Sequence, residues 1–157
     1  MERKILKSIK IKKTNNPEYG YEHKEELLAE TKQHIHDVGQ VMSMIGCELA
    51  DRGDLHDWTK LDFFDEFAKD TLERLDTPDF KERDWYKIHT GMERHHINAH
   101  IPENVDLIDI LEMVVDCIVA GKSRTGYVNP YYLILRGDIL EKAYWNTVKK
   151  IDSHVKF

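Results

Sequence analysis

Apolar residues recur every three or four positions along most of the chain, which is the spacing of one face of an α-helix. The longest run of this kind predicts a helix over residues 22–51. Its inward stripe is expected to contain Ile35, Val38, Met42, Ile45 and Leu49. Residues 52–54, Arg-Gly-Asp, predict the end of that helix.

The same spacing predicts four further helices. A second is expected from about Thr59 and a third is expected to end before Pro102. The inward positions of the second helix are Leu61, Phe64, Phe67 and Ala68. Asn104 is a candidate N-cap of a fourth helix that stops at Gly121, and a fifth follows over residues 131–153. No later segment alternates like a strand, so the predicted fold class is all-α, a compact bundle of about five main helices.

Charge divides the chain into two regions. Residues 1–13 hold six basic side chains and one acidic side chain, whereas the whole chain of 157 residues has a net charge of −6. We therefore expect a basic N-terminal arm over residues 1–20, separated by turn-forming residues from a single helical domain over residues 21–157. The arm is either a solvated terminus or a contact for nucleic acid or an anionic substrate.

The composition favours a cytoplasmic protein. No run of about 18 apolar residues predicts a membrane span, and the basic start lacks the apolar stretch of a secretory signal. Cys47 and Cys117 have neither metal-binding nor disulfide-framework spacing, so both are expected to be small core residues in a reducing compartment.

The chain has nine histidines, and most of them lie in residues 34–56 and 89–100. Neutral imidazole is the commonest metal ligand. At 100° per residue, His34 falls beside the apolar stripe of the first helix and His36 falls on the opposite side. His34 is therefore the candidate ligand and is expected to point inward, although a histidine beside such a stripe is more often a core residue.

The adjacent pair His56-Asp57 is the strongest candidate for a metal site. Two such side chains at a helix start can bind one metal, and the carboxylate can bridge to a second ion. The alternative is an acidic turn in which Thr59 caps the next helix. The position of the pair, after an inward-facing histidine on a long helix, favours the metal site.

A second group of histidines lies in residues 89–100. If the third helix is continuous there, one face carries His89, Glu93, His96 and His100. Such a face is more typical of metal ligation than of core packing or a solvated surface. The helical spacing favours His89 and His96 over His95 as ligands.

The fourth predicted helix carries Asp109, Glu112 and Asp116 opposite its main apolar stripe. They form either a solvated acidic face or, if this largely apolar helix is buried on several sides, a site where a carboxylate needs a partner or a metal. From the residues alone the two interpretations of Asp116 are equally supported.

The order of these features resembles the HD superfamily of metal-dependent phosphohydrolases. That order is His34, then His56-Asp57, then His89 with His95-His96, then Asp116. The chain is most similar to a largely phage-encoded branch of the superfamily without an assigned activity, over about residues 27–150. The matching motifs include residues 56–60, His-Asp-Trp-Thr-Lys, and residues 112–116, Glu-Met-Val-Val-Asp.

The resemblance implies two groups of metal ligands. One ion is bound by His34, His56, Asp57 and Asp116, and a second is bound by His89 together with His95 or His96. The ligand types favour Mn, Fe, Co or Ni over Mg, because imidazoles are poor partners for Mg.

We expect hydrolysis of a small phosphoester, with a nucleotide as the substrate of choice, by metal-activated water. Asp57 would bridge the ions and His89 could act as general acid. Lys60 lies three residues after Asp57 and so on the same helical face, where it can contact a phosphate. Weaker candidates for phosphate contact are Arg94, Lys122 and Arg124.

Two other functions are compatible with the sequence, and the first of them uses the same metal ligands. One is a metal- or nucleotide-binding module without turnover, for example a phage accessory protein. The other is a protein that docks on nucleic acid through the basic residues of the arm.

Overall fold

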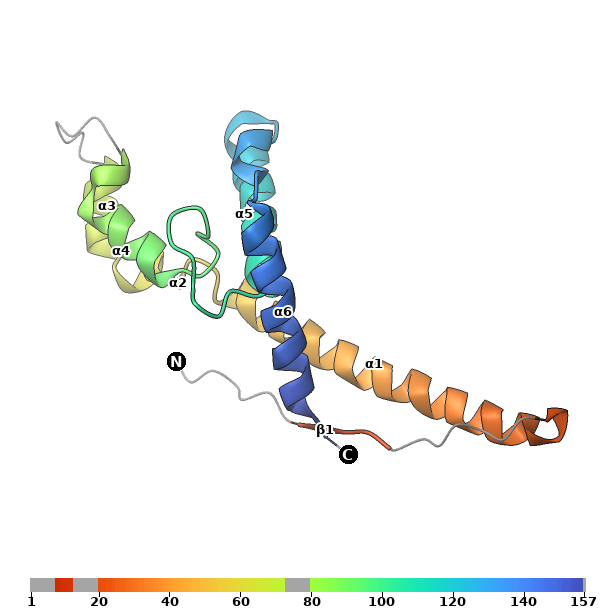
Figure 1. The fold of residues 1–157 in the computed structure, drawn as a ribbon. Coiled ribbons are helices and arrows are strands. Elements are labelled where there is room, and N and C mark those ends of the chain that lie inside the picture. Colours follow the sequence, from red (N-terminus) through yellow and green to blue (C-terminus); the bar gives the residue numbers. More distant parts are fainter. Residues whose placement is uncertain (1–7, 13–19, 73–79, 157) are drawn as a thin grey trace. The chain divides into compact units, whose positions relative to one another are not determined.

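The computed structural model describes residues 8–12, 20–72 and 80–156, and over these residues the chain is all-α (Figure 1). The helices are α1 (Lys24–Asp54), α2 (Trp58–Asp62), α3 (Phe64–Leu72), α4 (Asp84–Met92), α5 (Leu107–Thr125) and α6 (Gly137–His154). Three short 3-10 turns are η1 (Tyr21–His23), η2 (Phe80–Glu82) and η3 (Pro130–Leu133). The strands of the described residues are the two-residue segments β1 (Ile9–Lys10) and β2 (Val155–Lys156). The predicted all-α class is confirmed.

The chain divides into two compact units, which are residues 1–51 with 148–157, and residues 52–147. In the first unit β1 pairs in parallel with β2, so the described part of the basic arm contacts the C-terminal end of the chain. The N–H of Ile11 extends this pairing and donates to the carbonyl of Lys156 at 2.8 Å. Lys150 on α6 forms an ion pair with Glu48 on α1.

Four of the five apolar residues predicted to lie inward on α1 are exposed, and the fifth, Ile45, is half-buried. Ile35 is 64% exposed and Met42 is 62% exposed. The described residues of the first unit offer only the end of α6, η1 and a short strand pair to cover a helix of 31 residues. His34 is exposed as well, so the prediction that it points inward is wrong.

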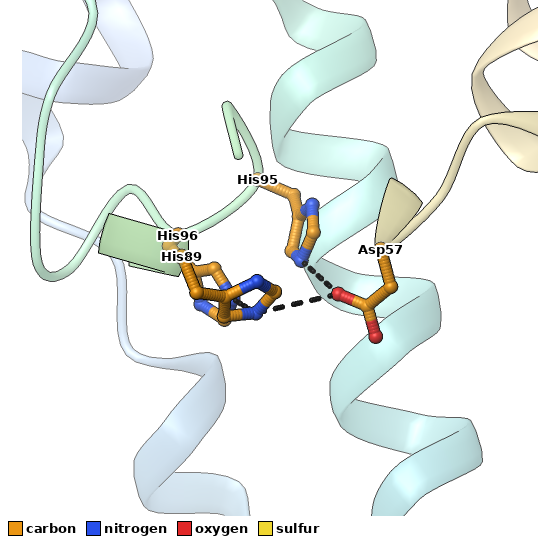
Figure 2. A group of neighbouring side chains, drawn as sticks. All are labelled: Asp57, His89, His95 and His96. Atoms are coloured by element: carbon orange, nitrogen blue, oxygen red, sulfur yellow. Dashed lines mark hydrogen bonds and ion pairs between the residues drawn. The ribbon is translucent and has the colours of Figure 1, made fainter. Parts of the chain in front are cut away.

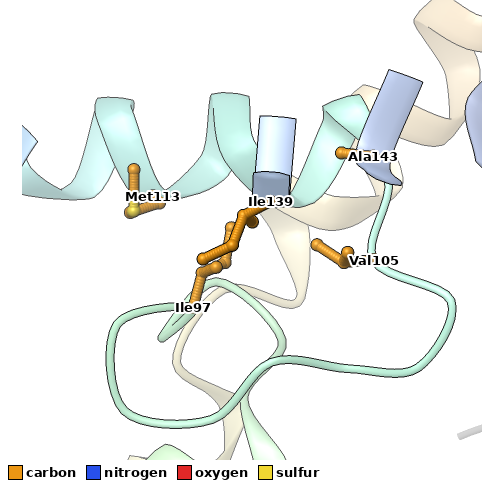
Figure 3. Packing of buried hydrophobic residues seen from close by; sticks show 5 residues of the cluster. All are labelled: Ile97, Val105, Met113, Ile139 and Ala143. Atoms are coloured by element: carbon orange, nitrogen blue, oxygen red, sulfur yellow. The ribbon is translucent and has the colours of Figure 1, made fainter. Parts of the chain in front are cut away.

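A small apolar core in the second unit joins α5 and α6 to the connection before α5 (Figure 3). Its buried members are Ile97, Val105, Met113, Ile139 and Ala143. Fully burying a large aliphatic side chain contributes about 1.5–3 kcal/mol. Because Ile97 and Val105 belong to the segment between α4 and α5, the core holds that segment against both helices. The histidines just before Ile97 are thereby kept close to α5.

Helix α5 begins with a capping box centred on Asp106 rather than with the predicted cap Asn104. The Asp106 side chain accepts from the N–H groups of Ile108 and Asp109, and the Asp109 side chain accepts from the N–H of Asp106. Asn104 is instead used as an acceptor for Arg94.

The same helix continues past Gly121, where the sequence predicted its end. It stops at Thr125, and Gly126 follows in the left-handed conformation with φ 83°. A Cβ on Gly121 would come within 2.9 Å of the carbonyl oxygen of Tyr127. Gly121 is therefore needed because the chain packs closely against it.

The second predicted helix is divided into α2 and α3 at Phe63. Phe63 has φ −118° and ψ 45°, which is not a helical conformation. Leu61 and Phe64, on either side of the break, are exposed instead of inward. Phe67 keeps its predicted role and packs on Trp85 of α4, with ring centroids 4.6 Å apart.

Two smaller expectations concern membrane-spanning helices and the cysteines of the described residues. None of their helices has both the length and the apolar content needed to cross a membrane. Cys47 is exposed rather than in the core, Cys117 is half-buried, and both are free thiols.

Candidate metal centre

Three histidines of the second unit converge on the carboxylate of Asp57 (Figure 2). Asp57 Oδ1 lies 3.4 Å from Nε2 of His89 and 3.5 Å from Nε2 of His95. Nε2 of His96 lies 2.7 Å from Nε2 of His89. One ligand atom from each of the four residues lies within 4.8 Å of the others, so together they can hold one metal ion.

Asp57 has a left-handed backbone conformation, with φ 56° and ψ 26°. It is the one non-glycine residue with a positive φ in the described part of the chain. This conformation costs an L-residue roughly 1–2 kcal/mol, although Asp tolerates it better than most residues. The backbone of the turn between α1 and α2 is therefore strained at the residue whose carboxylate points toward the histidines. Such local strain is typical of functional sites.

The histidines after α4 do not continue that helix, although the sequence analysis considered a continuous helix there. Glu93 follows the last helical residue and is extended, with φ −88° and ψ 117°. The next residues turn and bring His95 beside His89, with only 1% of His95 exposed. The expected helical face does not form, and the turn brings His95 and His96 together with His89.

A second group shares Asp57 and adds His56 and Asp116. Nε2 of His56 lies 3.5 Å from Asp57 Oδ2 and 3.5 Å from Asp116 Oδ1. Asp57 therefore faces the two groups with different carboxylate oxygens, an arrangement suited to bridging two ions. Lys60 also lies here, in an ion pair with Asp57 Oδ2.

A buried hydroxyl determines which nitrogen of His89 carries the proton. Thr59 Oγ1 donates to Glu93 Oε1 at 2.8 Å, so it accepts from Nδ1 of His89 at 2.7 Å. The backbone N–H of Thr59 donates to the same Glu93 oxygen at 3.0 Å. With its proton on Nδ1, His89 presents the lone pair of Nε2 to Asp57, which is the form that binds a metal.

Replacing Thr59 by valine is expected to weaken metal binding by about 10- to 100-fold, the usual effect of losing a group that orients a ligand. The change keeps the shape of the side chain but removes the acceptor for Nδ1 of His89. Isothermal titration with Mn²⁺ measures the effect. Thr90→Val is the control, because Thr90 is also buried but, among the described residues, its hydroxyl bonds to α4 carbonyls alone. Equal affinities of the two variants would contradict the orienting role.

Glu112 orients two further imidazoles. Its Oε1 lies 3.1 Å from Nδ1 of His56 and 3.0 Å from Nδ1 of His95. An acceptor at both Nδ1 atoms favours a proton there and leaves Nε2 of each ring to face Asp57. The three residues could themselves hold an ion, but this geometry assigns Glu112 to orienting the histidines.

Arg52 connects Glu112 to a fully buried carboxylate, Asp109, which a second arginine, Arg94, also holds. Asp109 is 0% exposed, accepts from Nε and Nη2 of Arg94 at 2.8 and 2.6 Å, and pairs with Arg52. Nη1 of Arg52 lies 3.6 Å from Oε2 of Glu112. Because Arg94 also donates to Asn104, we assign it to holding this network rather than to the predicted substrate contact.

Burial and charge give the histidines different protonation states. Burial lowers the pKa of His89 to about 4 and that of His96 to about 3. Hydrogen bonds to Asp116 and Glu112 instead raise the pKa of His56 to about 10. Burial favours the neutral form of Glu112, but hydrogen bonds from His56 and His95 outweigh it and lower the pKa of Glu112 to about 2. At neutral pH the metal-free cluster therefore holds a protonated His56 beside the ionised carboxylates of Glu112 and Asp116, together with neutral His89 and His96.

The metal-free protein is expected to lose stability as the pH falls from 6.5 to 5. His89 and His96 have folded pKa values below the ordinary 6.5. As the pH falls, both histidines are therefore protonated in the unfolded chain before they are protonated in the folded protein, which shifts the equilibrium toward unfolding. His56 has the opposite sign, but its contribution is already present in full below 6.5 and is lost only as the pH rises through about 10. Thermal unfolding with a chelator present measures this, and an unchanged midpoint over that pH range would contradict it.

The donor set fits a transition metal. Oδ1 of Asp57 and Nε2 of His95 are buried and make no hydrogen bond to described residues. Buried polar atoms normally have a partner, and these are the atoms that a bound cation would satisfy. Imidazoles combined with carboxylates suit Mn, Fe, Co or Ni better than Mg.

The remaining predicted residues lie outside the three groups. Lys122 and Arg124 are exposed in the last two turns of α5. His100 is exposed beyond the turn that carries His95. His34 lies on α1 in the other unit, and its role as a ligand stays a prediction from the resemblance.

Sequence analysis assigned no orienting role to Thr59, Glu93 or Glu112. Glu93 follows His89 by four residues and Glu112 precedes Asp116 by four, so this spacing could have identified both carboxylates. No comparable signal marks Thr59, because both partners of its hydroxyl come from a segment about thirty residues away.

Comparison with protein-family models matches residues 23–150 to a family of unknown function, DUF5662. Searches of curated proteins and of solved structures find no match.

Proposed function

Because this match covers most of the chain, the protein belongs to DUF5662, and we propose that it is a metal-dependent hydrolase of small phosphoesters. The observation that supports the proposal most is the convergence of Asp57, His89, His95 and His96. A second group that shares Asp57 adds to this support. Nucleotides are the proposed substrate class.

Each residue of the site has a separate role in the proposed reaction. Asp57 faces the two groups with its two oxygens and is suited to join them. Bound transition metal ions lower the pKa of water and stabilise charge on phosphoryl oxygens. Lys60, a cation already at the Asp57 carboxylate, is placed to bind a phosphate oxygen. His89 is held neutral and oriented by Thr59, which suits it to act beside the reacting group.

Phosphate release tests the proposal. The protein is reloaded with Mn²⁺ and incubated with a panel of nucleoside monophosphates, cyclic nucleotides and simple phosphoesters. Turnover of at least one of them that chelation abolishes is the expected result. Tight metal binding without turnover of any of them would contradict hydrolysis and favour a binding module with the same ligands.

A further inference from the structure

The far end of α5 and the loop after it expose three tyrosines beside two basic residues. We call Lys122, Arg124, Tyr127, Tyr131 and Tyr132 the basic-aromatic patch. The three tyrosines are 67%, 77% and 64% exposed, and both basic side chains are exposed. Aromatic rings normally contribute to packing by being buried, so a group of exposed rings indicates a binding surface.

The chain folds back along α5 and holds these residues close together. The carbonyl oxygen of Tyr127 packs against Gly121 and accepts from Oγ1 of Thr125 at 3.0 Å. The carbonyl oxygen of Tyr132 lies 3.8 Å from Sγ of Cys117. The backbone of both tyrosines is therefore fixed against the stretch of α5 that ends in the two basic residues of the patch.

The charge of this segment differs from that of the rest of the chain. Residues 117–137 contain three basic residues and no acidic residue, in a chain with 29 acidic and 23 basic side chains. Arg136 pairs with Asp138, whereas Lys122 and Arg124 form no ion pair within the described part of the chain. The segment therefore offers two free positive charges among exposed rings.

We propose that the basic-aromatic patch binds single-stranded nucleic acid. Exposed tyrosines provide faces on which unpaired bases stack, and the two cations contact backbone phosphates. A duplex fits this surface less well, because it offers no unstacked bases to the tyrosines. Its dense phosphate charge also requires a more extended basic surface than this acidic protein has. The proposal does not depend on the hydrolase activity, because the patch lies outside the metal groups.

Fluorescence anisotropy with labelled oligo(dT) and oligo(rU) of about 20 nucleotides tests the proposal on the full chain. Tyr131→Ala combined with Tyr132→Ala is expected to weaken binding at least about tenfold, from the loss of stacking. Lys122→Glu combined with Arg124→Glu is expected to weaken it as well. This second variant should also reduce the slope of log Kd against log salt by about 1.4, from two lost phosphate contacts.

The control variant is Lys142→Glu combined with Lys149→Glu, which makes the same charge change on exposed positions of α6. Circular dichroism and thermal unfolding establish that each variant is folded. Binding that survives both patch variants, or that is lost only on deletion of residues 1–13, would overturn the proposal. Binding to anionic lipid vesicles but to neither oligonucleotide would also overturn it. Tighter binding of oligo(dT) or of oligo(rU) shows whether the ligand is DNA or RNA, and either result supports the proposal.

Discussion

Replacing Asp57 by asparagine is expected to reduce metal affinity and phosphoester turnover by at least about a hundredfold, because even orienting residues contribute 10- to 100-fold. The carboxylate faces the two metal groups with its two oxygens, so asparagine leaves one oxygen for both groups and removes the negative charge that they share. Asparagine keeps the size of the side chain and tolerates the left-handed conformation of this position. Isothermal titration with Mn²⁺ and a phosphate-release assay measure the two effects.

Asp62→Asn is the matched control for this change. Asp62 is an exposed carboxylate at the end of α2, five residues farther along, and belongs to none of the three groups. It should bind metal and turn over substrate as the wild type does. Equal losses in the two variants would mean that negative charge near the site matters and that ligation by Asp57 does not.

Replacing Asp109 by asparagine is expected to lower the free energy of unfolding by about 3–5 kcal/mol, the usual cost of breaking a buried ion pair. The change leaves Arg52 and Arg94 facing a neutral amide that can accept through only one oxygen. For a domain of this size the unfolding midpoint should fall by roughly ten degrees. Differential scanning calorimetry of the metal-free protein measures the shift.

The control for this change is Asp138→Asn. Asp138 also pairs with an arginine, Arg136, but both side chains are more than 60% exposed. An ion pair this exposed is screened by water and contributes little to stability, so the midpoint should hardly move. A comparable shift in both variants would contradict the importance assigned to burial at Asp109.

The sequence predicted the positions of the long helices because their local signals are strong. Helix α5 was expected from a cap near Asn104 to Gly121 and spans Leu107–Thr125. Both errors at its ends come from tertiary contacts. Asn104 is occupied by Arg94, and Gly121 serves a close approach of Tyr127 rather than a helix end.

The candidate site was predictable in membership and less so in geometry. The motif order identified His56, Asp57 and Asp116, and the structure brings these three together. His95 was disfavoured because helical spacing assumes that the helix continues. That helix ends before Glu93, whose carboxylate is held by Thr59. Because this contact joins Glu93 to a residue 34 positions earlier, the helical periodicity of residues 89–100 could not show where the helix ends.

The first helix shows the same limit on a larger scale. A stripe of apolar residues predicts an amphipathic helix, and α1 is one. The pattern alone does not state what covers the stripe, and within its unit α1 keeps Ile35 and Met42 exposed. The inward orientation inferred for His34 failed for this reason.

Metal content measured by mass spectrometry, after purification and after reloading with Mn²⁺, tests whether the Asp57 groups bind metal. Roughly one or two equivalents of a divalent transition metal per chain are expected, because the two groups share the carboxylate of Asp57. Two equivalents would mean that both groups are filled. A wild-type protein that retains no metal above background after reloading would contradict the account.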